Sequence, residues 1–195
     1  MMVIARESLL GLEQYARVRP QFRAQVIAHK KNRTLHVGEH VTLVFEDELT
    51  IRYQIQEMLR IERTFEEEGI VGELDVYSPL VPDGHNWKAT MLIEFPDEAQ
   101  RREWLGRLKG VEHRVWVRTE GFAPVYAIAD EDLERENDVK TSSVHFLRFE
   151  LGPERVRAML RGTAMAVGID HAAYAAAVDP VPEAIRNSLC GDLRA

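Results

Sequence analysis

The chain has 195 residues, of which 45% are hydrophobic and 29% charged, and its formal net charge is −7. This is the composition of an ordinary globular domain that builds a core without disulfides or metals, and the net charge argues against nucleic-acid binding. Cys190 is the single cysteine, so no disulfide can form within the chain and a reducing, cytoplasmic compartment is expected. We see no signal peptide, and no apolar run approaches the roughly 18 residues that a membrane span requires.

The N-terminal part of the chain is predicted to be largely helical. Pro20 biases the preceding residue away from helix, so the pattern predicts a short helix near 8–17 and a second over about 20–33. A strand is expected at 40–45, and the longest periodic helix runs from about 50 to 68, where Gly69 ends it. A strand at 73–78, a turn-rich loop at 79–86 and a strong strand at 87–95 complete this half.

The second half alternates short strands with helices. Asp97 is expected to cap a helix that ends at Gly110. The remaining predicted elements are strands at 113–119, 125–129 and 143–151, a polar loop at 130–140, and helices at 152–168, 170–178 and 182–193. Because few strands are separated by a crossover helix, the pattern predicts one α+β domain over residues 1–195 with a mostly antiparallel sheet of about four to six strands and a helical C-terminus. The helical segment 1–35 is expected to pack on this domain.

One short motif matches a known metal-binding pattern. His36-Val37-Gly38-Glu39-His40 has the His-x-x-Glu-His order of inverted zinc peptidases, whose chemistry needs both histidines on one face of a helix. Here Gly38 interrupts the motif and a β-rich run follows it directly. We therefore expect a turn leading into a strand, and we assign no metal ligands here.

The second helix carries its cations on the face that is most apolar. On a helical wheel, Arg23 and Lys30 share a side with Phe22 and Val26. Three explanations remain open: the Arg and Lys stems cover apolar surface while their charges reach water, the cations form internal ion pairs, or they line a site for an anionic ligand.

The long helix shows a matching feature. Gln54 and Glu62 fall within its apolar arc, whereas Glu57 falls on the opposite face. A buried carboxylate without a partner is costly, so Glu62 is expected to pair with a cation such as Arg23 or Lys30. Such a pair either locks two helices together or forms half of a polar pocket. The candidate ligand-binding residues are therefore Arg23, Lys30, Gln54, Glu57 and Glu62.

The other histidines are scattered along the chain. A metal site built from His85, His145 and His171 is not excluded by their spacing, although most such histidines are ordinary surface or core groups. The sequence has no Gly-rich phosphate loop, no Cys-x-x-Cys pair and no nucleophile elbow.

Several segments resemble a bacterial family catalogued as a domain of unknown function, number 3501. The resemblance rests on the stretch 45–63, on Pro82-Asp83-Gly84, on the strands 89–94 and 143–149, and on Asp170-His171-x-x-Tyr174. Genes of that family often lie beside those for rubrerythrin-like and iron–sulfur proteins, so the resemblance implies a redox or oxidative-stress setting with such a protein as partner. It implies no catalytic residues.

Two functions are compatible with these observations. The first is an accessory or ligand-binding protein that partners a rubrerythrin-like or iron–sulfur protein, which agrees with the lack of a catalytic signature. The second is an enzyme or sensor that binds a small anion between the basic helix and the long helix, with Glu62 or Glu57 as acid–base group. Neither the oligomeric state nor a cofactor can be predicted.

Overall fold

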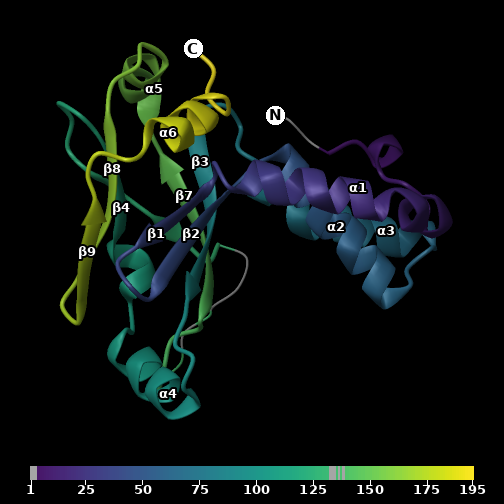
Figure 1. The fold of residues 1–195 in the computed structure, drawn as a ribbon, viewed down its shortest axis with the longest axis horizontal. Helices are drawn as coiled ribbons and strands as arrows, with labels where there is room; N and C mark the ends of the chain where they lie inside the picture. The colour runs from purple at the N-terminus through teal and green to yellow at the C-terminus, as the bar shows by residue number, and fades with distance from the viewer. Residues whose placement is uncertain (1–3, 132–134, 136, 138) are drawn as a thin grey trace.

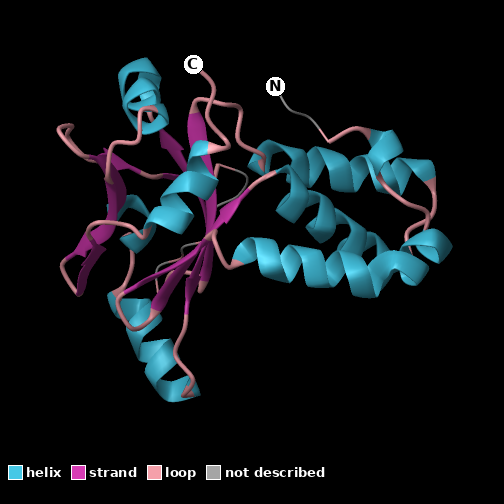
Figure 2. Ribbon diagram, turned by 45° about the horizontal axis from the view of Figure 1, so that its top comes forward, coloured by secondary structure: helices cyan, strands magenta, loops and turns pink. Residues whose placement is uncertain are grey.

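The computed structural model describes residues 4–131, 135, 137 and 139–195. The chain forms a helical arm that projects from a body of β-strands (Figure 1). Figure 2 shows that the arm contains helices and loops, whereas the strands gather in the body with further helices around them. No helix in the described ranges is both long enough and apolar enough to cross a bilayer.

Three helices build the arm: α1 (Leu12–Lys30), α2 (Glu48–Glu62) and α3 (Glu67–Tyr77), with the 3₁₀ turns η1 (Arg6–Ser8) and η2 (Ser78–Leu80) at its margins. Helices α1 and α2 run antiparallel, because Tyr15 near the start of α1 bonds Glu57 near the end of α2, and His29 near the end of α1 bonds Asp47 at the start of α2. Their buried apolar residues form a core of their own, which includes Ile51, Ile55, Leu59, Ile70 and Leu74. Within the described part of segment 1–35, α1 thus packs mainly along α2.

Helix α1 continues through Pro20, so the prediction of two helices separated there is wrong. Proline removes one backbone donor, which leaves the carbonyl of Ala16 without its helical partner. Both Ala16 and Pro20 lie on the exposed side of α1. Water can therefore satisfy the free carbonyl, and the buried residues Tyr15 and Val26 hold the helix on either side of the proline.

The long helix ends earlier than predicted. A capping box between Asp47 and Thr50 starts α2, and Arg63 in the left-handed conformation, with φ 56°, ends it. The strand predicted at 73–78 is also wrong, because residues 67–77 form α3. Ile70 and Leu74 are spaced by one helical turn and are buried against α2, which outweighs the weak strand preference of this segment.

The body holds two antiparallel sheets, which confirms the predicted α+β class and the antiparallel pairing. The first sheet has the order β1-β2-β3-β7-β6, formed by Thr34–Val37, Val41–Glu46, Asn86–Ile93, Val144–Glu150 and Ile128–Ala129. The second has the order β5-β4-β8-β9, formed by Val125–Tyr126, Val115–Thr119, Met165–His171 and Tyr174–Val178. The sequence predicted one sheet of about four to six strands, whereas the described residues form two sheets, of five and four strands. Apolar side chains of both sheets share one core, with Phe45, Trp87, Phe149, Val117 and Val167 among its members.

Strands β8 and β9 occupy segments for which helices were predicted. Alanine favours helix by only a fraction of a kcal/mol per residue, and the pairing of β9 with β8 overrides this preference in Tyr174–Val178. In β8 the glycine is a packing requirement, because a Cβ on Gly168 would lie 2.3 Å from the ring of Trp116 on the neighbouring strand. The sequence pattern does not reveal this contact.

The remaining helices lie around the body: α4 (Glu98–Arg107), the 3₁₀ turn η3 (Val111–Arg114), α5 (Gly152–Leu160) and α6 (Glu183–Cys190). Asp97 caps α4 through the backbone N–H of Gln100, as predicted. Arg33 joins the arm to the body. It is 1% exposed and donates to the carbonyl oxygens of Phe45 and Glu46 and to the carboxylate of Asp192 near the C-terminus.

Candidate functional site

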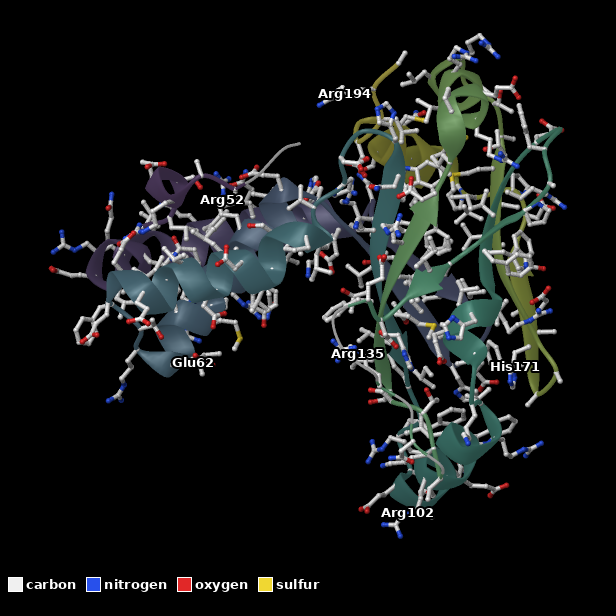
Figure 3. All side chains as sticks on the ribbon, turned by 180° about the vertical axis from the view of Figure 1, so that it is seen from behind. Arg52, Glu62, Arg102, Arg135, His171 and Arg194 are labelled. Atoms are coloured by element: carbon white, nitrogen blue, oxygen red, sulfur yellow. The ribbon has the colours of Figure 1, made fainter. Side chains whose placement is uncertain are left out.

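A hollow with largely apolar walls lies in the angle between the arm and the five-stranded sheet, and we call it the arm–sheet cleft. It has a volume of about 420 Å³. The arm contributes Asp75, Val76, Tyr77, Pro79 and Leu80, and the body contributes Lys88, Glu131, Phe146, Leu147 and Arg148. Arg135, which belongs to the same region of the body, lies beside the sheet on the side of the arm (Figure 3).

Two cations lie side by side on the sheet at the floor of the cleft. Residues alternate in and out along β3 and β7, and the register places Lys88 directly opposite Arg148 on the outer face. Like charges at such positions destabilise a sheet unless they are compensated. Arg148 is compensated: its guanidinium donates to both carboxylate oxygens of Glu131 at 2.7 Å and also contacts Glu150. The Arg148 guanidinium holds the pKa of Glu131 below its usual range.

Lys88 has no such direct ion pair among the described residues. Its side chain is half-buried, and within the described ranges its ammonium group has no carboxylate at ion-pair distance. Burial lowers the pKa of Lys88 and the neighbouring charge of Arg148 lowers it further, while the charges of Glu131, Asp83 and Glu150 offset these effects in part. The cleft therefore contains a partly desolvated ammonium group beside apolar walls.

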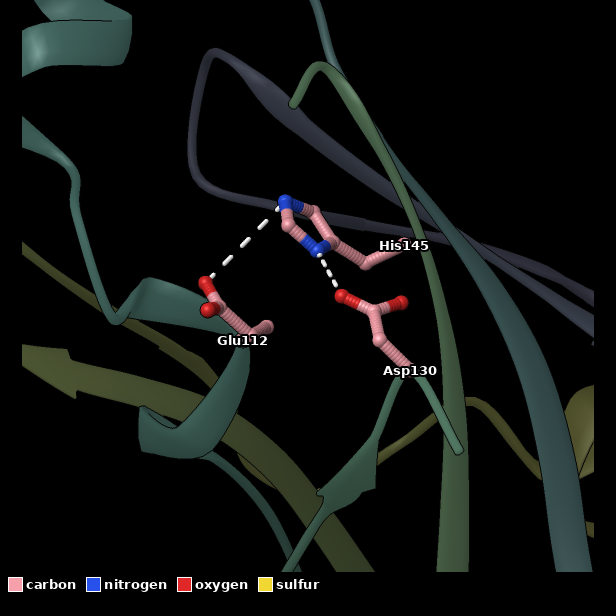
Figure 4. Close-up of side chains that lie close together, drawn as sticks. All are labelled: Glu112, Asp130 and His145. Carbon is pink, nitrogen blue, oxygen red and sulfur yellow. Dashed lines mark hydrogen bonds and ion pairs between the residues drawn. The ribbon is translucent and has the colours of Figure 1, made fainter. Parts of the chain in front are cut away.

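A buried polar cluster lies on the inner side of the same strand and consists of Glu112, Asp130 and His145 (Figure 4). The His145 side chain is fully buried, and its Nδ1 lies 2.5 Å from Asp130 Oδ2. Its Nε2 lies 3.0 Å from the Thr141 hydroxyl, 3.0 Å from the Ser142 carbonyl oxygen and 4.0 Å from Glu112 Oε2. These groups come from η3, from the end of β6 and from β7 with the segment before it.

Asp130 connects this cluster to the cleft. Its backbone is left-handed, with φ 51°, a conformation that Asp adopts more readily than most residues. The carboxylate also accepts from the backbone N–H of Phe146 at 2.9 Å and pairs with Arg135. Since Glu131 follows directly, the buried cluster fixes the position from which Glu131 reaches Arg148 at the floor of the cleft.

The residues predicted as ligand-binding are not gathered in one place. Glu57 accepts from the Tyr15 hydroxyl at 2.7 Å, from Arg19 at 2.7 and 2.9 Å and from Arg60 at 3.2 Å. These donors, with the Arg19 hydrogen bonds first, lower the pKa of Glu57 to about 2 although partial burial opposes them. Glu57 is therefore a carboxylate that ties α1 to α2.

Glu62 is exposed, so the prediction that it points into the core and pairs with a cation is wrong. Its angle on the helical wheel is that of the packed face, but it is the last residue of α2, and neither Ile61 nor Phe65 beside it is covered. Figure 3 shows it on the arm, far from both sheets. Within the described residues it forms no ion pair, and its charge, after burial, contributes to the raised pKa of Glu73 on α3.

The antiparallel packing also separates the other candidates. Lys30 ends α1 beside the start of α2, so it lies a full length of α2, about 22 Å for 15 residues, from Glu62. Arg23 is exposed on α1. Gln54 is exposed as well, and its side chain bonds the Tyr77 hydroxyl. A ligand site formed by these residues remains a prediction.

The histidine motifs have structural roles. His36 lies on β1 and His40 follows the turn at Gly38, which has φ 74°, so the segment is a β-hairpin as expected and not a helix. His36 bonds Thr42 across the hairpin, and His40 stacks on Phe95 at 4.0 Å. His85 is exposed in its loop, and His171 bonds the Lys109 carbonyl oxygen. Of the three scattered histidines, the polar cluster contains His145 alone.

Four residues of these two sites were not singled out from the sequence: Lys88, Arg148, Glu112 and Asp130. Their proximity depends on strand register and on the path of the chain between the sheets, which no local pattern encodes. A signal was available for His145, because it alternates in phase with Leu147 and Phe149, which marks it as inward-facing on a strand.

The fold and the sites define an α+β protein with two antiparallel sheets and a helical arm. The chain belongs to the family described as "Protein of unknown function (DUF3501)", whose model matches residues 3–193 and so confirms the resemblance. It is similar to a novel protein of unknown function from Burkholderia pseudomallei K96243, known from a crystal structure, with 55% sequence identity and a TM-score of 0.94. The match covers 99% of this chain and 100% of that one. No curated protein matches.

Proposed function

We propose that this protein binds a small organic anion with an apolar body in the arm–sheet cleft. The observation that carries the proposal is the half-buried Lys88 ammonium group, which lies on the floor of the cleft and has no carboxylate partner in the described part of the chain. A desolvated charge is costly, and a ligand carboxylate or similar anion would remove that cost.

The surroundings of Lys88 support an anion rather than a neutral ligand. Arg148 holds Glu131 and Glu150 in direct ion pairs. Lys88 has no such direct contact in the described part of the chain, and Glu131, Asp83 and Glu150 act on its charge only at longer range. The walls contributed by Val76, Leu80 and Phe146 are apolar and suit the hydrocarbon part of a ligand, as in most small-molecule sites.

An accessory role agrees with such a binding site. The family resemblance implies a redox or oxidative-stress setting with a rubrerythrin-like or iron–sulfur partner, and a cytoplasmic location is expected from the sequence. We propose this setting on the resemblance alone. A ligand-binding protein needs no catalytic group, so the proposal assigns no reaction to the cleft.

The test is calorimetric titration with octanoate, which combines a carboxylate with an apolar chain. We expect octanoate to bind the wild-type protein and octylamine, which has the same chain and the opposite charge, not to bind. Lys88→Met should abolish the binding of octanoate, whereas Lys31→Met, which removes an exposed lysine on the arm, should leave it unchanged. Equal affinity of the wild type and Lys88→Met for octanoate, or equal binding of octanoate and octylamine, would refute the proposal.

A further inference from the structure

Glu112 is a buried carboxylate with weak compensation. Its side chain is 5% exposed, and its one hydrogen bond among the described residues comes from the Thr141 hydroxyl at the long distance of 3.5 Å. The nearest basic side chains are the imidazoles of His113, at 3.8 Å, and His145, at 4.0 Å. A carboxylate removed from water normally has short hydrogen bonds or a close cation, so Glu112 indicates a group that completes its environment.

The histidine that faces Glu112 is already oriented. His145 Nδ1 is bonded to Asp130, which leaves Nε2 directed toward Glu112, the Thr141 hydroxyl and the Ser142 carbonyl oxygen. Histidines that bind metal ions almost always use their second ring nitrogen in this way, with a carboxylate or carbonyl as partner. Asp130 would thus hold the ring for a ligand at Nε2.

The spacing of these atoms suits a metal ion. Metal–ligand distances of roughly 2.0–2.2 Å for histidine nitrogen and carboxylate oxygen allow the two atoms to lie up to about 4.2 Å apart on either side of one ion. His145 Nε2 and Glu112 Oε2 are 4.0 Å apart. The Thr141 hydroxyl oxygen forms a triangle with them, at 3.0 Å from Nε2 and 3.5 Å from Oε2.

We propose that the protein binds one first-row divalent cation at His145 and Glu112, with Thr141 and the Ser142 carbonyl oxygen as neutral ligands and Asp130 as the orienting carboxylate. One imidazole nitrogen and several oxygen atoms suit Mn²⁺, Fe²⁺ or Zn²⁺. The site is buried and closed, so its role is structural. It would fix η3 to β7 and, through Asp130, set the position of Glu131 in the arm–sheet cleft.

The alternative is an internal ion cluster, in which a protonated His145 lies between Asp130 and Glu112 and donates to the Ser142 carbonyl oxygen. Both arrangements satisfy the same geometry. They differ in whether the protein takes up metal, and this difference is measurable on the wild-type chain.

The experiment uses purified protein stripped with a chelator and then titrated separately with Zn²⁺ and Mn²⁺, with Fe²⁺ added under anaerobic conditions. We expect one equivalent of at least one ion to bind, a higher melting temperature with that ion, and reversal of both effects by the chelator. Asp130→Asn should weaken binding about 10–100-fold, the effect typical of an orienting partner. Glu112→Gln, which keeps the shape of the side chain, should weaken it more.

A double variant, His36→Gln with His40→Gln, serves as the control, because it removes the His-x-x-Glu-His motif and leaves the proposed site intact. It should bind the ion as tightly as the wild type. Wild-type protein that takes up none of the three ions at 1 mM would overturn the proposal even if the buried variants fail to fold. Binding that is lost in the control variant and retained in Glu112→Gln would also overturn it.

Discussion

Substitution of Glu57 by glutamine tests how the helical arm is held together. The Glu57 side chain is 14% exposed and accepts hydrogen bonds from Tyr15, Arg19 and Arg60. Glutamine has nearly the same shape but lacks the charge, and its amide nitrogen cannot accept a hydrogen bond. The variant therefore removes an ionic contact between α1 and α2 and leaves the packing of the helices intact.

The size of the stability loss in Glu57→Gln follows from the lowered pKa of the Glu57 carboxyl group. The pKa of Glu57 falls from 4.5 to about 2, and each pH unit of such a difference corresponds to about 1.4 kcal/mol, which sets an upper bound of about 3.5 kcal/mol. Arg19, the main partner, has a side chain that is 33% exposed, so solvent screens the pair. We therefore expect a loss of about 2 kcal/mol, or about 4–8 °C in melting temperature for a chain of this size.

The assay is thermal unfolding followed by circular dichroism, with Glu62→Gln as a matched control on the same helix. Glu62 is exposed at the C-terminal end of α2, where a negative charge is unfavourable, so its substitution should leave the melting temperature unchanged or raise it slightly. If Glu57→Gln melts within one degree of Glu62→Gln, the ionic contact contributes nothing and this account of the arm is refuted.

The same pair predicts a pH dependence. Because the folded protein lowers the pKa of Glu57, its contribution to stability is fully present above about pH 4.5 and is lost as the pH falls toward 2. The difference in melting temperature between wild type and Glu57→Gln should therefore shrink over this range. A difference that stays constant down to pH 2 would show that the charge is not responsible.

Three further predictions concern the body of the protein. Arg33→Met should cost roughly 3–5 kcal/mol because it leaves Asp192 buried without its partner, and urea titration would show this as a lower midpoint; an effect below 1 kcal/mol would contradict it. Lys88→Met should stabilise the protein by about 1 kcal/mol or less, since it removes a desolvated charge. Because the pKa of Lys88 is lower in the folded protein than in the unfolded chain, this gain in stability should diminish as the pH rises toward 10.5. Gly168→Ala should destabilise by about 1–3 kcal/mol because its methyl group meets the Trp116 ring, and a melting temperature equal to wild type would refute that contact.

The strands of the central sheet could be predicted because their sequences alternate. The pattern placed a strand at 87–95 and another at 143–151, and the structure has them at Asn86–Ile93 and Val144–Glu150. In both strands most of the inward residues are apolar, so one face is specified by sequence alone. The helix cap at Asp97 is equally local, since it needs only a short side chain and a neighbouring backbone N–H.

Features that depend on distant neighbours could not be predicted. The helical wheel placed Glu62 on the packed face of α2. It does not reveal that α2 ends at Glu62, where the neighbouring residues Ile61 and Phe65 are exposed. Residues predicted to be helical form strands β8 and β9 because each strand pairs with a neighbouring strand. Residue propensities contain no information about such pairing. The candidate sites depend even more on register, since Lys88 faces Arg148 across two strands that lie 60 residues apart in sequence.

The most direct test of the central claim observes the ammonium group of Lys88 itself. The chain has five lysines, at positions 30, 31, 88, 109 and 140, so reductive ¹³C-methylation, which preserves the charge, gives a small set of signals for nuclear magnetic resonance. The Lys88 signal is assigned by its loss in Lys88→Arg. We predict that this signal titrates below the usual pH range of a lysine side chain and moves when octanoate is added. A Lys88 signal that titrates within that usual range and does not respond to octanoate would contradict the account.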